Sequence, residues 1–119
     1  MSERGSATVE LALLVPLIIL IMAMIVEVAL AGRLQIEVVA AAREGARVAA
    51  TTPDPAAALD AAVSILGPRG HDARINVHRP HVVGGEASVT VSLEHRVSIP
   101  VLDWISVPLS ATSVMRVEN

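Results

Sequence analysis

An uninterrupted apolar run near the N-terminus constrains this chain more than any other feature. Residues 11–26 are all apolar, and the run continues to Gly32 with Glu27 as its one charge. As a helix, residues 11–32 would span roughly 33 Å, close to the thickness of a bilayer's hydrocarbon core. A single segment in lipid must satisfy its backbone groups internally. We therefore predict a transmembrane helix.

A cleaved signal peptide is the main alternative for this segment. Signal peptides have an apolar region of about 7–15 residues that ends in a small-residue cleavage site. Here the run is longer, the helical pattern continues beyond it, and only Arg4 precedes it as a basic residue. These features favour a retained anchor. Within it, Pro16 predicts a kink or a locally melted turn, because proline lacks an N–H and clashes with the preceding turn.

The composition excludes several classes of site. The chain of 119 residues has no cysteine, so disulfides and cysteine-ligated metals are excluded. It has one tryptophan, no other aromatic residue and a net charge of −3, which argues against binding to nucleic acid. Setting the anchor aside leaves roughly 85 residues for a folded domain, a small core by any measure.

The helical pattern continues from Arg33 to about Ala50. Apolar and small residues recur there at spacings of three and four. Small residues four positions apart allow another backbone to approach closely. We expect helix packing through Ala42, Gly45 and Ala46, either on the protein's own sheet or against sister subunits. One stripe comprises Leu34, Val38, Ala41, Gly45 and Val48, and the second comprises Ala42, Ala46 and Ala50.

A second, shorter helix is predicted over residues 55–66. The two prolines in residues 51–55 end the first helix, and Asp54 can cap the next one, with Pro55 at its first position. Leu59, Val63 and Leu66 would form its apolar face. Residues 67–70 (GPRG) are a turn that closes this helix.

The remaining residues show the alternation of β-strands. Strands are predicted over 73–79, 87–99 and 107–117, with a hairpin signal at Gly84-Gly85. Pro108 restricts the last strand to an edge or a bulge. Residues 100–105 form a connection with an apolar plug, in which Trp104 is a core plug or an interfacial anchor. The predicted fold class is α+β: a long transmembrane helix that continues into a soluble helix, a short second helix and about three antiparallel strands.

Two segments of the sequence resemble the TadE family, the minor pilins or pseudopilins of the Flp/Tad branch of type IV pilus machinery. They are residues 4–17 (RGSATVELALLVPL) and 41–47 (AAREGAR). The resemblance covers residues 4–50 closely and residues 111–118 (ATSVMRVE) more loosely. It implies a type IV pilin-like helix and a structural role in the Flp/Tad pilus, in cell adhesion or in a related secretion machinery.

The resemblance also implies processing by a prepilin peptidase that cuts after the leader glycine, here between Gly5 and Ser6. Glycine is the smallest residue, which suits a tight peptidase site, and the cut frees an amine on Ser6, one helical turn before Glu10. Paired charges at a bilayer edge offset much of the cost that each incurs alone. In such filaments the pairing is implied to be between subunits. The alternative is that Glu10 is an ordinary first-turn acid favoured by the helix dipole.

Three segments follow from this interpretation: a prepilin leader at 1–5, a transmembrane helix at 6–32 and an extracytoplasmic TadE-like domain at 33–119. The resemblance implies a single-pass protein of the cytoplasmic (inner) membrane, with its N-terminus in the cytoplasm, its domain outside and an association with the pilus. The expected partners are the lipid bilayer, other pilin subunits (Flp and TadE- or TadF-like), the prepilin peptidase and the Tad membrane assembly proteins.

The arginines oppose this orientation. Arg4 precedes the span, whereas Arg33, Arg43 and Arg47 follow it, so charge counting alone would place the N-terminus outside. The shortness of the N-terminal head and the family resemblance favour the opposite topology. Glu27 either reaches the outer interface near Arg33 or forms an ion pair with a neighbouring subunit, so Glu27 and Arg33 form a predicted inter-subunit pair.

No arrangement of residues indicates catalysis. The sequence has no nucleophile elbow and no recognisable triad, so we expect no enzymatic activity. We also expect no cofactor and no metal, because the histidines match no zinc-site spacing and no cysteine assists them. The alternative function is an uncleaved, membrane-tethered extracellular binding module. The four histidines are His71, His78, His81 and His95.

Overall fold

The computed structural model describes residues 3–118 and confirms the α+β fold class. Met1, Ser2 and Asn119 lie outside the described residues, so the predicted leader is described only at residues 3–5. In chain order the elements are helix α1 (Glu3–Thr51), helix α2 (Pro55–Leu66), 3-10 helix η1 (Gly67–His71), strand β1 (Arg74–His78), strand β2 (Glu86–Arg96), 3-10 helix η2 (Pro100–Leu102) and strand β3 (Ser106–Arg116).

Helix α1 runs for 49 residues through both the apolar run and the small-residue stripes. The helix is continuous at Pro16, so the alternative of a locally melted turn there is wrong. The carbonyl groups at its C-terminal end find partners elsewhere in the chain. Arg79 Nε donates to the carbonyl of Ala49 over 2.7 Å, and the N–H of Glu118 donates to that of Ala50 over 3.1 Å. These bonds satisfy groups that a helix end leaves open.

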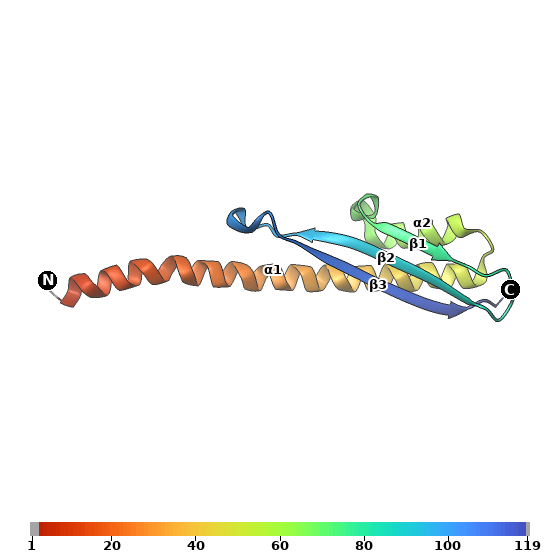
Figure 1. Ribbon diagram of the computed structural model, residues 1–119, viewed down its shortest axis with the longest axis horizontal. Coiled ribbons are helices and arrows are strands. Elements are labelled where there is room, and N and C mark those ends of the chain that lie inside the picture. Colours follow the sequence, from red (N-terminus) through yellow and green to blue (C-terminus); the bar gives the residue numbers. More distant parts are fainter. Residues whose placement is uncertain (1–2, 119) are drawn as a thin grey trace.

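The strands form one antiparallel sheet in the order β1-β2-β3 (Figure 1). Gly84, at the predicted hairpin, has φ +85°, a backbone conformation that glycine adopts without strain. β3 is an edge strand, as Pro108 predicted. β2 is shorter than predicted because residues 97–99 leave the strand before Pro100, although the N–H of Val97 still donates to the carbonyl of Ile105.

The core lies between the C-terminal half of α1, α2 and the inner face of the sheet. Apolar side chains alternate inward along β2, which is the pattern expected for a strand with one covered face. The buried face of α2 differs from the prediction, because Leu59 is exposed and Val63 is only half-buried. The residues of α2 that are buried are Ala58, Ala62 and Leu66.

Small side chains explain this choice of face. Gly45 of α1 lies against α2 and β2: a Cβ atom built on it would be 3.4 Å from the carbonyl oxygen of Ala58 and 3.0 Å from Cγ1 of Val89. Small residues such as glycine and alanine let two helix backbones approach this closely. The alanine face of α2 therefore packs on the glycine and alanine face of α1, and the bulkier side chains lie beside that contact.

The sheet and α2 cover only the C-terminal half of α1 (Figure 1). The N-terminal half, drawn in red and orange, projects beyond them, so the molecule measures 81 × 22 × 17 Å. The connection between β2 and β3 is the part of the sheet that reaches farthest toward the projecting half. The structure thus consists of a bare rod and a folded head built along the other end of the same helix.

The contact at Gly45 leads to a prediction about stability. Gly45→Leu forces a side chain into the interface of α1 with α2 and β2, and should lower the free energy of unfolding of the head by about 1–3 kcal/mol. Gly32→Leu is the matched control, because a Cβ atom at Gly32 meets nothing within 4 Å. Thermal unfolding in detergent micelles, followed by circular dichroism, measures both. Equal stability of the two variants would contradict the packing described here.

Candidate functional site

The N-terminal half of α1 is an apolar surface that no other part of the described chain covers. Its large side chains from Leu11 to Val26 are exposed. Within residues 3–118, α1 is the one helix long and apolar enough to cross a membrane, with a mean hydropathy of 2.9 over its most apolar 18-residue window and none of that window buried. Such a surface is stable in lipid and unfavourable in water. The projecting half of α1 therefore has the properties of a membrane span.

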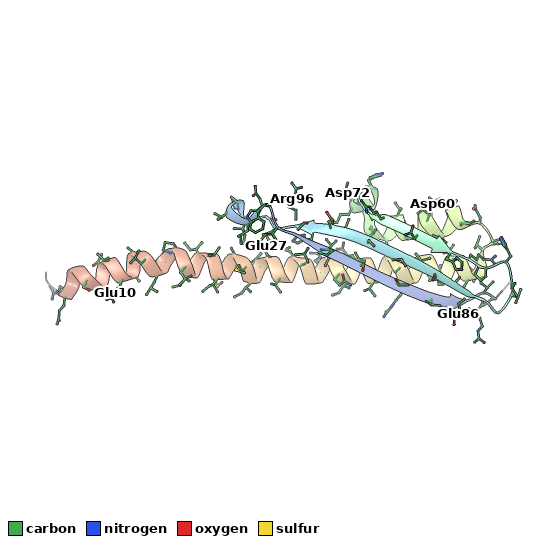
Figure 2. All side chains as sticks on the ribbon, viewed as in Figure 1. Glu10, Glu27, Asp60, Asp72, Glu86 and Arg96 are labelled. Atoms are coloured by element: carbon green, nitrogen blue, oxygen red, sulfur yellow. The ribbon has the colours of Figure 1, made fainter. Side chains whose placement is uncertain are left out.

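Glu10 is the one charged side chain between Gly5 and Val26. It is exposed on the projecting half of α1, away from the head (Figure 2). Among residues 3–118, no hydrogen bond or ion pair involves it. Ser6 lies four residues earlier, and residues at that spacing are neighbours on one helix face. A cation presented near Ser6, on this chain or on an adjacent one, could therefore reach the Glu10 carboxylate.

The predicted cleavage site lies in the first turns of α1. Gly5 and Ser6 are both helical and exposed. The hydroxyl of Thr8 donates to the carbonyl of Arg4 over 2.9 Å, one turn back along the helix. The peptide bond between Gly5 and Ser6 is thus accessible from outside, but it is held in helical geometry. Glycine weakens this turn, because it costs roughly 0.5–1 kcal/mol more than alanine inside a helix.

The predicted small-residue packing face is covered by the chain's own elements. Ala42, Gly45 and Ala46 are all buried in the core between α1, α2 and β2. Of the two alternatives for these residues, the structure shows the packing within the chain. Contacts with sister subunits at this level of the helix would have to use another face.

Glu27 has partners that lie outside α1. One carboxylate oxygen, Oε2, is 3.0 Å from Nε2 of His95, and the other, Oε1, accepts a hydrogen bond of 2.7 Å from the backbone N–H of Ser98. Both side chains of the Glu27–His95 pair are largely buried, with exposed fractions of 12% and 16%. Figure 2 shows Glu27 beneath the connection between β2 and β3. This contact fastens the near end of the sheet to the helix.

Arg33 lies away from Glu27 and belongs to a different group of charges. Its Nε atom is 3.7 Å from Glu37, which also accepts a 2.6 Å hydrogen bond from Arg69 of η1. The predicted pairing of Glu27 and Arg33 between subunits is not tested by a single chain and stays a prediction. Within the chain, both oxygens of Glu27 already have hydrogen-bond partners.

The role of His95 was not predicted from the sequence. The signal was present in the alternation of β2: residues 87, 89, 91 and 93 face inward, and His95 is the next position on that face. An imidazole on the covered face of a strand needs a hydrogen-bond partner. The one acid in the apolar run after Glu10 was the available candidate. Within residues 3–118, no three His, Asp or Glu side chains gather in a way that could hold a metal ion.

Two charges of the AAREGAR segment pair locally. Arg47 donates two hydrogen bonds to Glu44, of 2.9 and 2.5 Å, across one turn of α1. These hydrogen bonds lower the pKa of Glu44 and raise that of Arg47. Because the pKa of Glu44 is lower in the folded state, the pair stabilises the fold above the carboxylate's ordinary pKa. That stabilisation disappears as the pH falls through the lowered value. The pair is surface-exposed, so its contribution is small.

The contact of Glu27 with Ser98 can be tested by hydrogen exchange. Glu27→Ala removes the acceptor for the Ser98 amide, so exchange at Ser98 should become faster in detergent micelles, as measured by NMR. Glu94→Ala removes an exposed carboxylate next to His95 and should leave that exchange unchanged. Unchanged exchange at Ser98 in the Glu27→Ala variant would show that the carboxylate does not hold this connection.

One comparison with known proteins gives a match. Residues 5–47 match the family described as TadE-like protein, which covers the projecting half of α1 and most of its packed half. No curated protein and no solved structure matches the chain. The match connects this segment with proteins of the Flp/Tad pilus, and the long apolar helix of the chain fits a single-pass membrane protein. The N-terminal helix, with the glycine and the acid at its start, is therefore the part of the chain that is similar to the TadE-like family.

Proposed function

We propose that this chain is a minor pilin, or pseudopilin, that serves as a structural assembly component of the Flp/Tad pilus or a related secretion machinery. The observation that carries the proposal is Glu10, a lone carboxylate on a bare apolar helix, one turn after Ser6. An ionised group in lipid is costly unless it is paired. Within residues 3–118, the chain itself supplies no charged partner for the Glu10 carboxylate. A neighbouring subunit in an assembly would supply one.

The proposed partner is the amine that a prepilin peptidase frees on Ser6. Cleavage between Gly5 and Ser6 would remove Arg4 and the rest of the leader, and would place a positive charge at the first residue of the helix. A neighbouring subunit shifted along the helix axis could present this amine to Glu10. Pairing within the membrane boundary would offset much of the cost of burying either charge alone.

The weak first turn of α1 supports this cleavage. A peptidase must reach the carbonyl between Gly5 and Ser6, which in a helix is engaged with the next turn. Gly5 lowers the cost of opening this turn, and the turn is exposed. Glycine at this position would thus fit a narrow peptidase site and would also make it easier to unwind the first turn of the substrate helix.

The proposed topology has the N-terminus in the cytoplasm, residues 6–32 in the cytoplasmic membrane and the α+β head of residues 33–119 outside. The family match supports this orientation against the arginine count. The expected partners are other pilin subunits, the prepilin peptidase and Tad membrane assembly proteins. None of these roles involves catalysis by this chain.

A second candidate function is an uncleaved, membrane-tethered binding module. One observation favours it: a shallow groove of about 760 Å³ lies along the sheet and carries charged side chains of both signs. They include Asp72, Arg74, Glu94 and Arg96. N-terminal sequencing of the protein extracted from its native membrane separates the two candidates, because the binding module would keep its leader.

The cleavage proposal is tested with Gly5→Leu. The bulky side chain should block the cut, so the uncut precursor should accumulate in cells that carry the peptidase, as mass spectrometry of the N-terminus would show. Gly32→Leu is the matched control and should be processed normally. Processing of the Gly5→Leu variant at the same position and rate would remove the basis for this proposal.

The assembly proposal is tested with Glu10→Gln, which keeps the shape of the side chain and removes its charge. The variant should be cleaved normally, yet it should be recovered with other pilus subunits in much smaller amounts after crosslinking. Glu3→Gln removes a carboxylate that leaves with the leader and should have no effect. Normal recovery of the Glu10→Gln variant would exclude the proposed pairing with the amine.

A further inference from the structure

The connection between β2 and β3, residues 97–105, ends in an exposed apolar surface. We refer to these residues as the tip loop. Val101 and Trp104 each have 77% of their surface exposed, so the interpretation of Trp104 as a core plug is wrong. Trp104 is the one tryptophan of the chain. A large apolar side chain that the fold leaves uncovered requires an explanation.

The tip loop lies beside the part of α1 where the bare surface ends. It shares a groove of about 200 Å³ with one face of the helix, and the lining is apolar except for Glu27 and His95. Leu102 and Ile105 line the groove from the loop, and Met24 lines it from the helix. The apolar surface of the loop is therefore continuous with the apolar surface of the span. Figure 1 shows the same arrangement, with the loop pointing toward the projecting half of α1.

The loop is held in this place by the contact of Glu27 with His95 and with the Ser98 amide. Ser98 lies two residues after the end of β2, and the 3-10 helix η2 forms the compact turn of the loop. The N–H of Leu102 donates to Ile99, and that of Ile105 donates to Leu102. These bonds satisfy backbone groups of the loop internally, as a segment near lipid requires.

The height of the loop along α1 matches the far boundary of a bilayer. Glu10 and Glu27 are 17 residues apart in sequence, which corresponds to about 26 Å along a helix. The hydrocarbon core of a bilayer is about 30 Å thick. With Glu10 near one face of the membrane, the tip loop lies at the other, where tryptophan side chains are enriched because they are partly apolar and partly polar.

We propose that the tip loop docks into the lipid interface at the head side of the membrane, with Val101 and Trp104 as its lipid contacts. The one charged residue of the loop is Asp103, and the charged side chains Glu94 and Arg96 lie on the strand behind it. The head is then attached at two points, through α1 and through the loop. This inference needs only that α1 spans a bilayer with Glu10 near one face, and it does not depend on cleavage or on pilus assembly.

The native tryptophan tests the proposal without any substitution. The full chain is reconstituted in vesicles of phosphatidylcholine and phosphatidylglycerol whose acyl chains are brominated either near the carbonyl or near the chain end. Bromine quenches tryptophan on contact. Trp104 should show a blue-shifted emission and should lose more intensity with bromine near the carbonyl than with bromine near the chain end.

A matched control places the tryptophan at the other end of the sheet, in the double variant Trp104→Leu, Val83→Trp. Val83 is also an exposed apolar loop residue, and the neighbouring Gly84 is bonded to Val117 near the C-terminal end of α1. This variant should show the emission of tryptophan in water and no quenching. The proposal is overturned if Trp104 behaves like this control. It is also overturned if Trp104 is shielded without quenching and only at high protein-to-lipid ratios, because a second copy would then cover it.

Discussion

A single helix that must be stable in two environments is the constraint on which this structure depends. The first half of α1 has side chains that favour lipid, and its second half has glycine and alanine where other elements of the chain must approach. Because the helix is continuous, the position of the head along the membrane normal depends on the residue at which the exposed apolar surface of α1 ends and its packed glycine and alanine surface begins. The glycine at 45 and the alanine face of α2 let the head pack closely, which compensates for a core with few large side chains.

Much of the fold could be predicted from local patterns. The end of α1, the cap at Asp54, the hairpin glycine and the edge position of β3 each depend on a few neighbouring residues, and each is present in the structure. The buried face of α2 could not be predicted this way. Its leucine and valine looked like the packing face, but close packing of two helices favours the smaller alanines, and that preference depends on a partner distant in sequence.

In the candidate site, too, local arrangements could be predicted from the sequence and long-range contacts could not. Gly5, Ser6 and Glu10 lie within one short segment, so their arrangement on a helix follows from spacing alone. The contact of Glu27 with His95 joins residues 68 positions apart, and only the register of β2 against α1 brings them together. From the sequence alone, the role of an acid at the end of a membrane-length helix, such as Glu27, is ambiguous. In the folded chain it fastens the sheet to the helix, and this tie determines where the exposed tryptophan lies.

The hairpin of β2 and β3 lies lengthwise against α1, and this has a mechanical consequence (Figure 1). A pull on the head along the helix axis would slide the sheet over the helix instead of peeling one strand away. Such sliding loads the whole packed face between α1 and the sheet at once, together with the hydrogen bonds of Glu27 to His95 and Ser98. A head anchored by one helix would therefore resist tension along the helix axis in shear, with the packed residues of the interface sharing the load.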